Sequence, residues 1–105
     1  MRQYTTPTFT FTVKGIDLTA MDDVLVTFAD ATRTILVTKD SPTVTASGSD
    51  TIVETSLTQA ETGKFVQNTT GFAQINWLDG ATRCATEIIE ISIKENLIKE
   101  ILPNA

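Results

Sequence analysis

Residues 8–13 read TFTFTV, and this stretch decides the fold class. Phe9, Phe11 and Val13 alternate with threonines, so an extended chain has one apolar face and one hydroxyl-bearing face. Side chains branched at Cβ suit a pleated, half-buried strand and disfavour a helix. The stretch therefore predicts a β-strand that packs on one side and meets water on the other.

The same alternation continues along the chain between short breaks rich in Gly, Pro, Asp and Ser. It predicts further strands, the third of them a weak edge strand with a loop, over residues 24–29, 34–39, 43–50, 51–57, 73–79 and 82–93. In the second of these we expect Ile35 and Val37 to face inward. The Asp79-Gly80 dipeptide before the last strand predicts a hairpin with a type I′ turn.

One short helical turn interrupts the strands. Thr58 and Glu61 have the spacing of a capping box, in which both side chains satisfy free backbone donors at a helix start. Gly63 follows so closely that only about one turn fits. Six or seven antiparallel strands with one such turn predict an all-β fold, a small immunoglobulin-like β-sandwich over residues 1–105, with a small barrel as the alternative.

Charge and hydropathy exclude some classes of partner. The formal net charge is −5, and nucleic-acid binding depends on clustered Lys and Arg, so we expect no nucleic-acid partner. No apolar run approaches the ~18 residues of a membrane helix, and the first residues lack the apolar stretch of a signal peptide. We therefore expect a protein that is made in the cytoplasm and has no membrane partner.

The residue inventory is poor in catalytic groups. The chain has no His and a single Cys, so the usual nucleophile pairs and zinc ligand sets are missing, and we expect no enzyme, cofactor or metal. Asp22-Asp23 is interpreted as a solvated turn ahead of a strand, and Cys84 as an ordinary packed thiol. Asn68-Thr69-Thr70 matches the glycosylation pattern, which we interpret as accidental.

The C-terminal residues 94–105 carry a second apolar pattern. If this segment is helical, one stripe is formed by Leu97, Ile98, Ile101 and Leu102. The stripe either completes the core of its own domain or docks on another subunit, because an exposed stripe would promote aggregation.

Four segments spread along nearly the whole chain carry a resemblance to known proteins. They are Met1-Arg2, Thr5-Thr6-Pro7-Thr8 with Phe11, Leu57-Thr58-Gln59 with Glu61-Thr62, and Ile88-Ile89 with Ile91-Ser92-Ile93. In this order they resemble a group of short proteins encoded in bacteriophages and prophages of Gram-positive bacteria. Such proteins tend to be encoded near tail and baseplate genes and are similar in size to the N-terminal modules of baseplate proteins. The resemblance implies a bacterial cytoplasmic origin and a virion-associated role, and it brings no catalytic residues.

These observations lead to two functional hypotheses. The first is a non-enzymatic structural or interaction module of a phage or prophage tail or baseplate, whose partners are other phage structural proteins or a second copy of itself. The alternative is a module that binds carbohydrate or another ligand, because sandwich folds host many such sites. Tyr4 and Phe72 are the aromatic rings we expect to be exposed for such contacts, since Trp77, Phe9 and Phe11 have the phase of the core.

Overall fold

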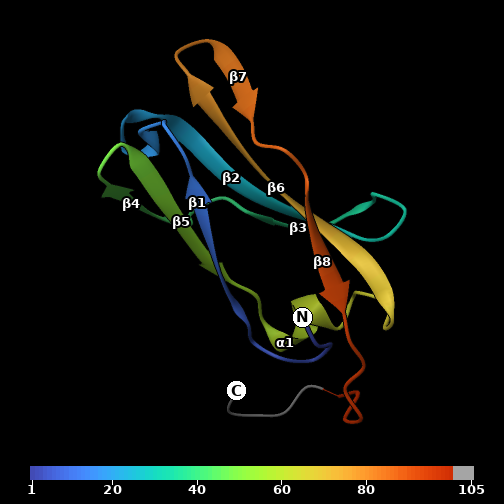
Figure 1. Cartoon of the computed structure of the whole chain (residues 1–105). Coiled ribbons are helices and arrows are strands. Elements are labelled where there is room, and N and C mark those ends of the chain that lie inside the picture. Colours follow the sequence, from blue (N-terminus) through green and yellow to red (C-terminus); the bar gives the residue numbers. More distant parts are fainter. Residues whose placement is uncertain (101–105) are drawn as a thin grey trace.

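Within residues 1–100, which the computed structural model describes, eight strands form two antiparallel sheets (Figure 1). The smaller sheet has the order β1-β5-β4, with β1 at Thr8–Val13, β4 at Thr43–Ser47 and β5 at Asp50–Ser56. The larger sheet contains β2 (Asp22–Ala29), β3 (Ile35–Lys39), β6 (Thr69–Asp79), β7 (Thr82–Ala85) and β8 (Ile89–Ile93). The predicted small β-sandwich is confirmed.

The long strand β6 is the centre of the larger sheet. One of its edges pairs with β2, which in turn pairs with the edge strand β3. Its other edge pairs with β7 at one end and with β8 at the other. The chain crosses between the sheets after β1, after β3 and after β5, so both sheets contribute to one core.

The strand count differs from the prediction because the expected strand over residues 82–93 is two strands. Residues 74–75 of β6 face residues 86–88, so the returning chain has one extra residue there. The hydroxyl of Thr86 accepts a hydrogen bond from the N–H of Ile75 at 3.1 Å, in place of a backbone carbonyl. This local bulge ends β7 and lets β8 begin in a new register.

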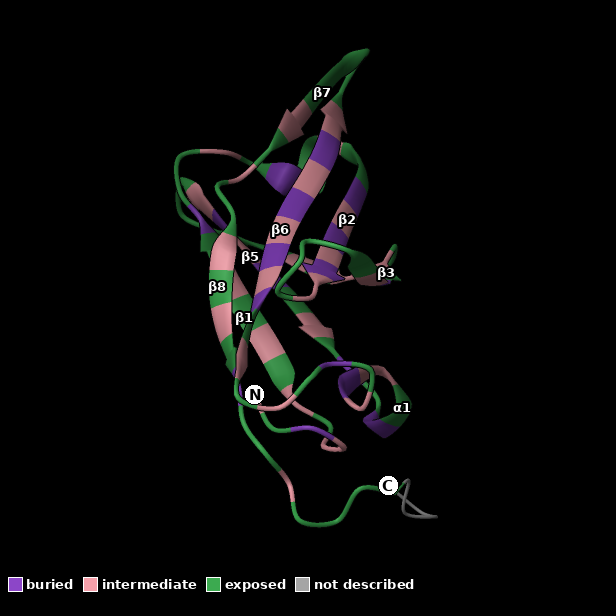
Figure 2. Ribbon diagram, turned by 90° about the vertical axis from the view of Figure 1, so that its right-hand side faces the viewer, coloured by how far each residue is buried: buried purple, intermediate pink, exposed green. Residues whose placement is uncertain are grey.

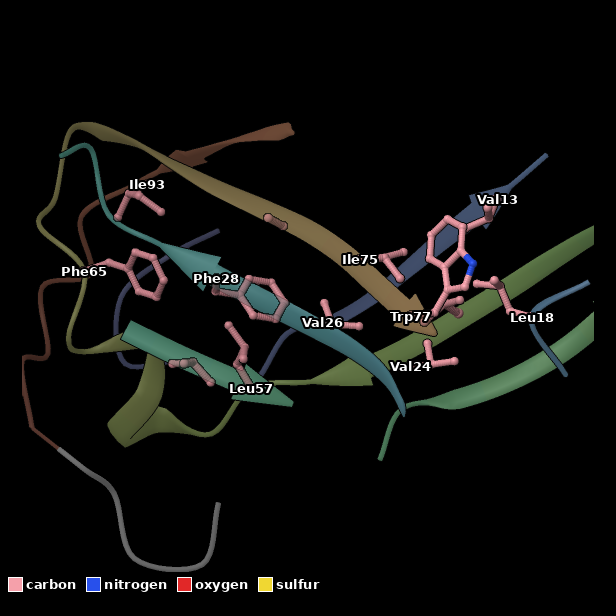
Figure 3. Packing of buried hydrophobic residues seen from close by; sticks show 13 residues of the cluster. Val13, Leu18, Val24, Val26, Phe28, Leu57, Phe65, Ile75, Trp77 and Ile93 are labelled. Atoms are coloured by element: carbon pink, nitrogen blue, oxygen red, sulfur yellow. The ribbon is translucent and has the colours of Figure 1, made fainter. Parts of the chain in front are cut away.

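The core lies between the two sheets (Figure 3). Alternate residues of β6 are buried, namely Ala73, Ile75 and Trp77, as predicted (Figure 2). Figure 3 shows two groups of side chains at opposite ends of the core, Phe28, Leu57, Phe65 and Ile93 at one end and Val13, Leu18, Val24 and Trp77 at the other. Phe9 and Phe11 are half-buried against this cluster, which confirms their phase.

In strand β5 and the residue after it, Val53 and Leu57 are buried and face the core. Thr51 shares this inner face and is fully buried. Its hydroxyl accepts a hydrogen bond from the N–H of Leu18 at 3.0 Å and donates one to the carbonyl of Ile16 at 2.6 Å. Thr51 thus connects the smaller sheet to the 3-10 turn η1 (Leu18–Ala20), where the chain crosses to the larger sheet.

Two further predictions fail at turns. The prediction that Ile35 faces inward is wrong: Phe28 pairs with Val37 but Ala29 pairs with Ile35, so Leu36 is an extra residue that turns Ile35 outward. The predicted type I′ turn is wrong as well, because Asp79 pairs with Thr82. The central residues are therefore 80–81, and only the glycine has a positive φ, of 62°, which is the II′ pattern.

The helical turn α1 (Gln59–Thr62) has the predicted capping box, with both reciprocal hydrogen bonds between Thr58 and Glu61. The Glu61 carboxylate also accepts a hydrogen bond from Lys39 Nζ at 2.7 Å, which ties α1 to β3. Partial burial raises the pKa of Glu61, but the hydrogen bonds from Lys39 and from the Thr58 N–H outweigh it, and the pKa lies below its ordinary value of 4.5.

Candidate interaction surface

The outward face of the larger sheet carries large apolar side chains among polar ones such as Thr27, Gln74 and Asn76. Leu25 and Leu78 point outward near one end of β2 and β6, and Phe72 points outward near the other. All three are half-buried. Because the solvent face of an antiparallel sheet normally carries polar residues, these three apolar side chains mark a candidate binding surface.

Around Phe72 the face is hollowed. A shallow hollow of about 190 Å³ is lined by Thr27, Ala29, Arg33, Ile35, Phe72, Ala73, Gln74 and Ile88. We call the side chains of Arg33, Ile35, Phe72 and Ile88 the outer patch. Ile35 is 64% exposed and Ile88 is 44% exposed, although both are large and apolar. Strands β2, β3 and β6 and the bulge before β8 together build this patch, which joins residues far apart in the sequence.

Arg33 is held over the patch by the turn between β2 and β3. The Asp30 carboxylate accepts hydrogen bonds from the N–H and hydroxyl of Thr32, at 2.9 and 2.6 Å, and from the N–H of Thr34 at 3.0 Å. These bonds, the Thr32 hydroxyl first, lower the pKa of Asp30 below its ordinary value of 3.8. They fix a turn in which Arg33 has a φ of 66°, a conformation that a residue with a Cβ seldom adopts.

In this conformation the Arg33 guanidinium lies 4.7 Å from the centre of the Phe72 ring. A cation over an exposed aromatic face contributes roughly 0.5–1 kcal/mol. Within residues 1–100, Arg33 has no carboxylate partner, since the two ion pairs found there are Lys39–Glu61 and Glu95–Lys99. The outer patch is therefore apolar with one positive charge whose hydrogen-bond donors are free to bind an anionic group.

The rest of the same face has a second, more open hollow of about 380 Å³ beside Leu25, Leu78 and Arg83. Asp22 and Asp23 do not form the turn that we expected ahead of the strand. They begin β2 at a bulge, where Asp23 has a φ of 50°, and both are exposed. Within the described part of the chain, no three His, Cys, Asp or Glu side chains gather closely enough to hold a metal ion.

Another hollow, of about 450 Å³, opens between the sheets where β7 gives way to β8. Phe11, Val13, Ile75 and Ile89 contribute its apolar walls, and Lys14 lies at its rim. Cys84 lies nearby on β7, opposite Trp77, and its half-buried thiol packs against the core as we expected.

Two sites predicted from the sequence, Tyr4 and the C-terminal segment, lie on the surface at the end of the molecule where α1 lies (Figure 1). Tyr4 is half-buried, and its ring lies so close to Gly63 that a Cβ there would be 2.6 Å from Tyr4 Cε1. It therefore covers the end of α1 and does not stand free. Leu97 is 90% exposed and Ile98 is 50% exposed.

The predicted apolar stripe of the C-terminal segment is not helical as far as the structure describes it, through residue 100. The N–H of Ile98 donates to Asn96 Oδ1 at 3.2 Å, which makes a local turn. Lys99 Nζ donates to Gln67 Oε1 at 2.8 Å and to Glu95 Oε2 at 3.1 Å. The other two residues of the stripe, Ile101 and Leu102, lie outside the described residues.

Sequence reasoning identified Phe72 but missed the other members of the outer patch. Ile35 faces outward only because of the bulge at Leu36, and Ile88 only because of the bulge between β7 and β8. The adjacent pair Ile88-Ile89 was the one signal, since it breaks the alternation. Arg33 gave no signal, because its place depends on the turn built by Asp30.

Comparison of the chain with models of protein families, with curated proteins and with solved structures gives no match. None of the helices in residues 1–100 is long and apolar enough to cross a membrane.

Proposed function

We propose that this chain is a non-enzymatic protein-interaction module and a component of a phage or prophage virion, in its tail or baseplate. The observation that carries the interaction role is the outer patch, where Ile35 and Ile88 expose large apolar surfaces beside the Arg33–Phe72 pair. A patch of this kind, apolar at its centre and charged at its rim, is typical of protein interfaces. The virion role follows from the resemblance of the four sequence segments.

The smaller sheet adds a second feature that suits assembly. Strand β4 is an edge strand, and its residues 43–47 carry no charge. Edge strands usually avoid pairing with other chains through Lys, Pro or bulges, and β4 has none of these within its bounds. This edge is suited to pairing with a strand of a neighbouring protein.

Purified particles test the proposal. The phage or lysogen that encodes the chain is altered to carry Ile35→Ser, and a matched strain carries Val66→Ser, since Val66 is 62% exposed and does not line the hollow. Mass spectrometry of density-purified particles should find the wild-type and Val66→Ser chains, and several-fold less of the Ile35→Ser chain. Absence of the wild-type chain from particles would contradict the virion role.

The outer patch also favours a second candidate, a carbohydrate-binding site. Phe72 and Ile35 supply apolar walls for a sugar ring beside the Arg33 guanidinium that covers the Phe72 face, with Thr27 and Gln74 as hydrogen-bonding neighbours around the hollow. A glycan array should then show binding that Phe72→Ala abolishes while Tyr4→Ala leaves it unchanged, since Tyr4 covers α1. No binding by the wild-type chain would rule out this candidate.

A further inference from the structure

Besides Val66, the large apolar side chains exposed on the described surface form two groups in different parts of the molecule. One is the outer patch, with Ile35 and Ile88 exposed on the larger sheet. The other is the segment after β8, where Leu97 and Ile98 are exposed. Burying apolar surface is favourable by about 25 cal/mol for each Å² removed from water. A contact between the two groups would remove the apolar surface of both from water.

The charges beside the two groups are complementary. Arg33 lies over the Phe72 ring without a carboxylate partner among the described residues. Glu100 is exposed two positions after Ile98 and has no ion pair within residues 1–100. Lys99, which lies between Ile98 and Glu100 in the sequence, already donates a hydrogen bond to Gln67. An apolar pair followed by a free carboxylate therefore matches an apolar hollow with a free guanidinium at its rim.

The geometry separates the two groups within one molecule. The contacts of Lys99 with Gln67 keep this segment near the loop that precedes β6. Figures 1 and 2 both show residues 94–100 leaving the end of the domain where α1 and the N-terminus lie. Within the described residues, Leu97 and Ile98 thus project from the end of their own domain.

We propose that the segment Leu97–Glu100 of one copy docks on the outer patch of a second copy. Leu97 and Ile98 cover the hollow beside Phe72, and the Glu100 carboxylate pairs with Arg33. The inference rests on the proposed interaction role and names its partner as a second copy of this chain. Because two different surfaces meet, the contact repeats from copy to copy and produces a ring or an open filament.

Charge reversal tests the ion pair in the full chain. Sedimentation velocity over a concentration series should show association that Arg33→Glu weakens about tenfold, and Glu100→Arg by a similar factor. The double variant should regain most of the lost affinity. Arg83→Glu is the matched control, since Arg83 is exposed on β7 away from the outer patch and the change in net charge is the same.

Disulfide trapping tests which copy supplies the segment. Ile35→Cys and Ile98→Cys are placed on separate copies with different tags, in a Cys84→Ala background that removes the native thiol. Mild oxidation should give a disulfide that joins a copy carrying one tag to a copy carrying the other. Ile35 is 64% exposed and Ile98 is 50% exposed, so neither substitution disturbs the core.

The outcomes separate this inference from the proposed function. Mixed disulfides together with rescue by the double reversal support the docking of one copy on another. An intrachain disulfide in a chain carrying both cysteines, with no mixed product, would show that the segment folds back, and it would overturn the inference. Equal effects of Arg33→Glu and Arg83→Glu would also overturn it, while presence of the chain in purified particles would leave the virion role intact.

Discussion

The buried hydroxyl of Thr51 gives the sharpest prediction about stability. Thr51→Val keeps the shape of the side chain and its branching at Cβ but removes the oxygen that bridges Leu18 and Ile16. The Leu18 N–H lies in the core, where the residue is 1% exposed, so no water replaces the lost acceptor. The Ile16 residue is only partly buried, and its carbonyl is less costly to leave unpaired.

The expected loss of stability follows from the Leu18 N–H and the Ile16 carbonyl, which both lose their hydrogen-bond partner. An unsatisfied buried polar group costs roughly 1–3 kcal/mol, so Thr51→Val should lower the free energy of unfolding by about 2–4 kcal/mol. For a domain with a stability of about 5–15 kcal/mol, this is a large share of the total. Thr51→Ser keeps the hydroxyl and loses one methyl group, so we expect a smaller loss of about 1 kcal/mol.

Urea unfolding followed by the fluorescence of Trp77 measures these differences. Trp77 is 5% exposed in the core, so its emission reports on the native packing. Thr55→Val is the matched control on the same strand, because Thr55 is half-buried and its hydroxyl makes no hydrogen bond in the described structure. It should change stability by less than about 0.5 kcal/mol. A Thr51→Val variant as stable as Thr51→Ser would refute the reasoning.

Three further outcomes are expected. Thr62→Val should lose about 2 kcal/mol in urea unfolding, because the buried Thr62 hydroxyl bonds both the N–H and the carbonyl of Thr5. Stability should fall in melts taken from about pH 5 downward, since the lowered pKa values of Asp30 and Glu61 mean that the unfolded chain binds protons first. Glu61→Gln should reduce this acid sensitivity. Asp30→Ala should release the turn, and NMR should then show the Arg33 side chain leaving its ring contact.

The sequence predicts the interior of this fold better than its surface. The alternation in β1 and β6 predicts which side chains reach the core, because burial of one face leaves a period of two in the sequence. The capping box of α1 is predictable because two residues three positions apart make it. The inward phase of Ile35 was predicted wrongly, because one extra residue opposite β2 reverses the alternation and depends on the pairing with a neighbouring strand.

The outer patch, like Ile35, could be predicted from the sequence only in part. Phe72 was predicted as an exposed ring because Trp77, Phe9 and Phe11 have the phase of the core, and the structure places it half-buried beneath Arg33. Its neighbours come from other strands and from two bulges, so no local sequence pattern predicts them. Leu97 and Ile98 are exposed, so they do not complete the core of their own domain, and docking on another subunit stays a prediction. The helix on which the four apolar residues would form one stripe is not present through residue 100.

Light scattering coupled to size exclusion tests the central claim most directly, that the outer patch is a contact surface. The full chain, Ile35→Ser and Val66→Ser are compared over the same range of concentrations, since the two substituted side chains are exposed to a similar degree, at 64% and 62%. We predict that the wild-type and Val66→Ser chains form the same oligomer and that Ile35→Ser shifts to monomer. A wild-type chain that stays monomeric at every concentration, or an oligomer that both variants keep unchanged, would contradict the account.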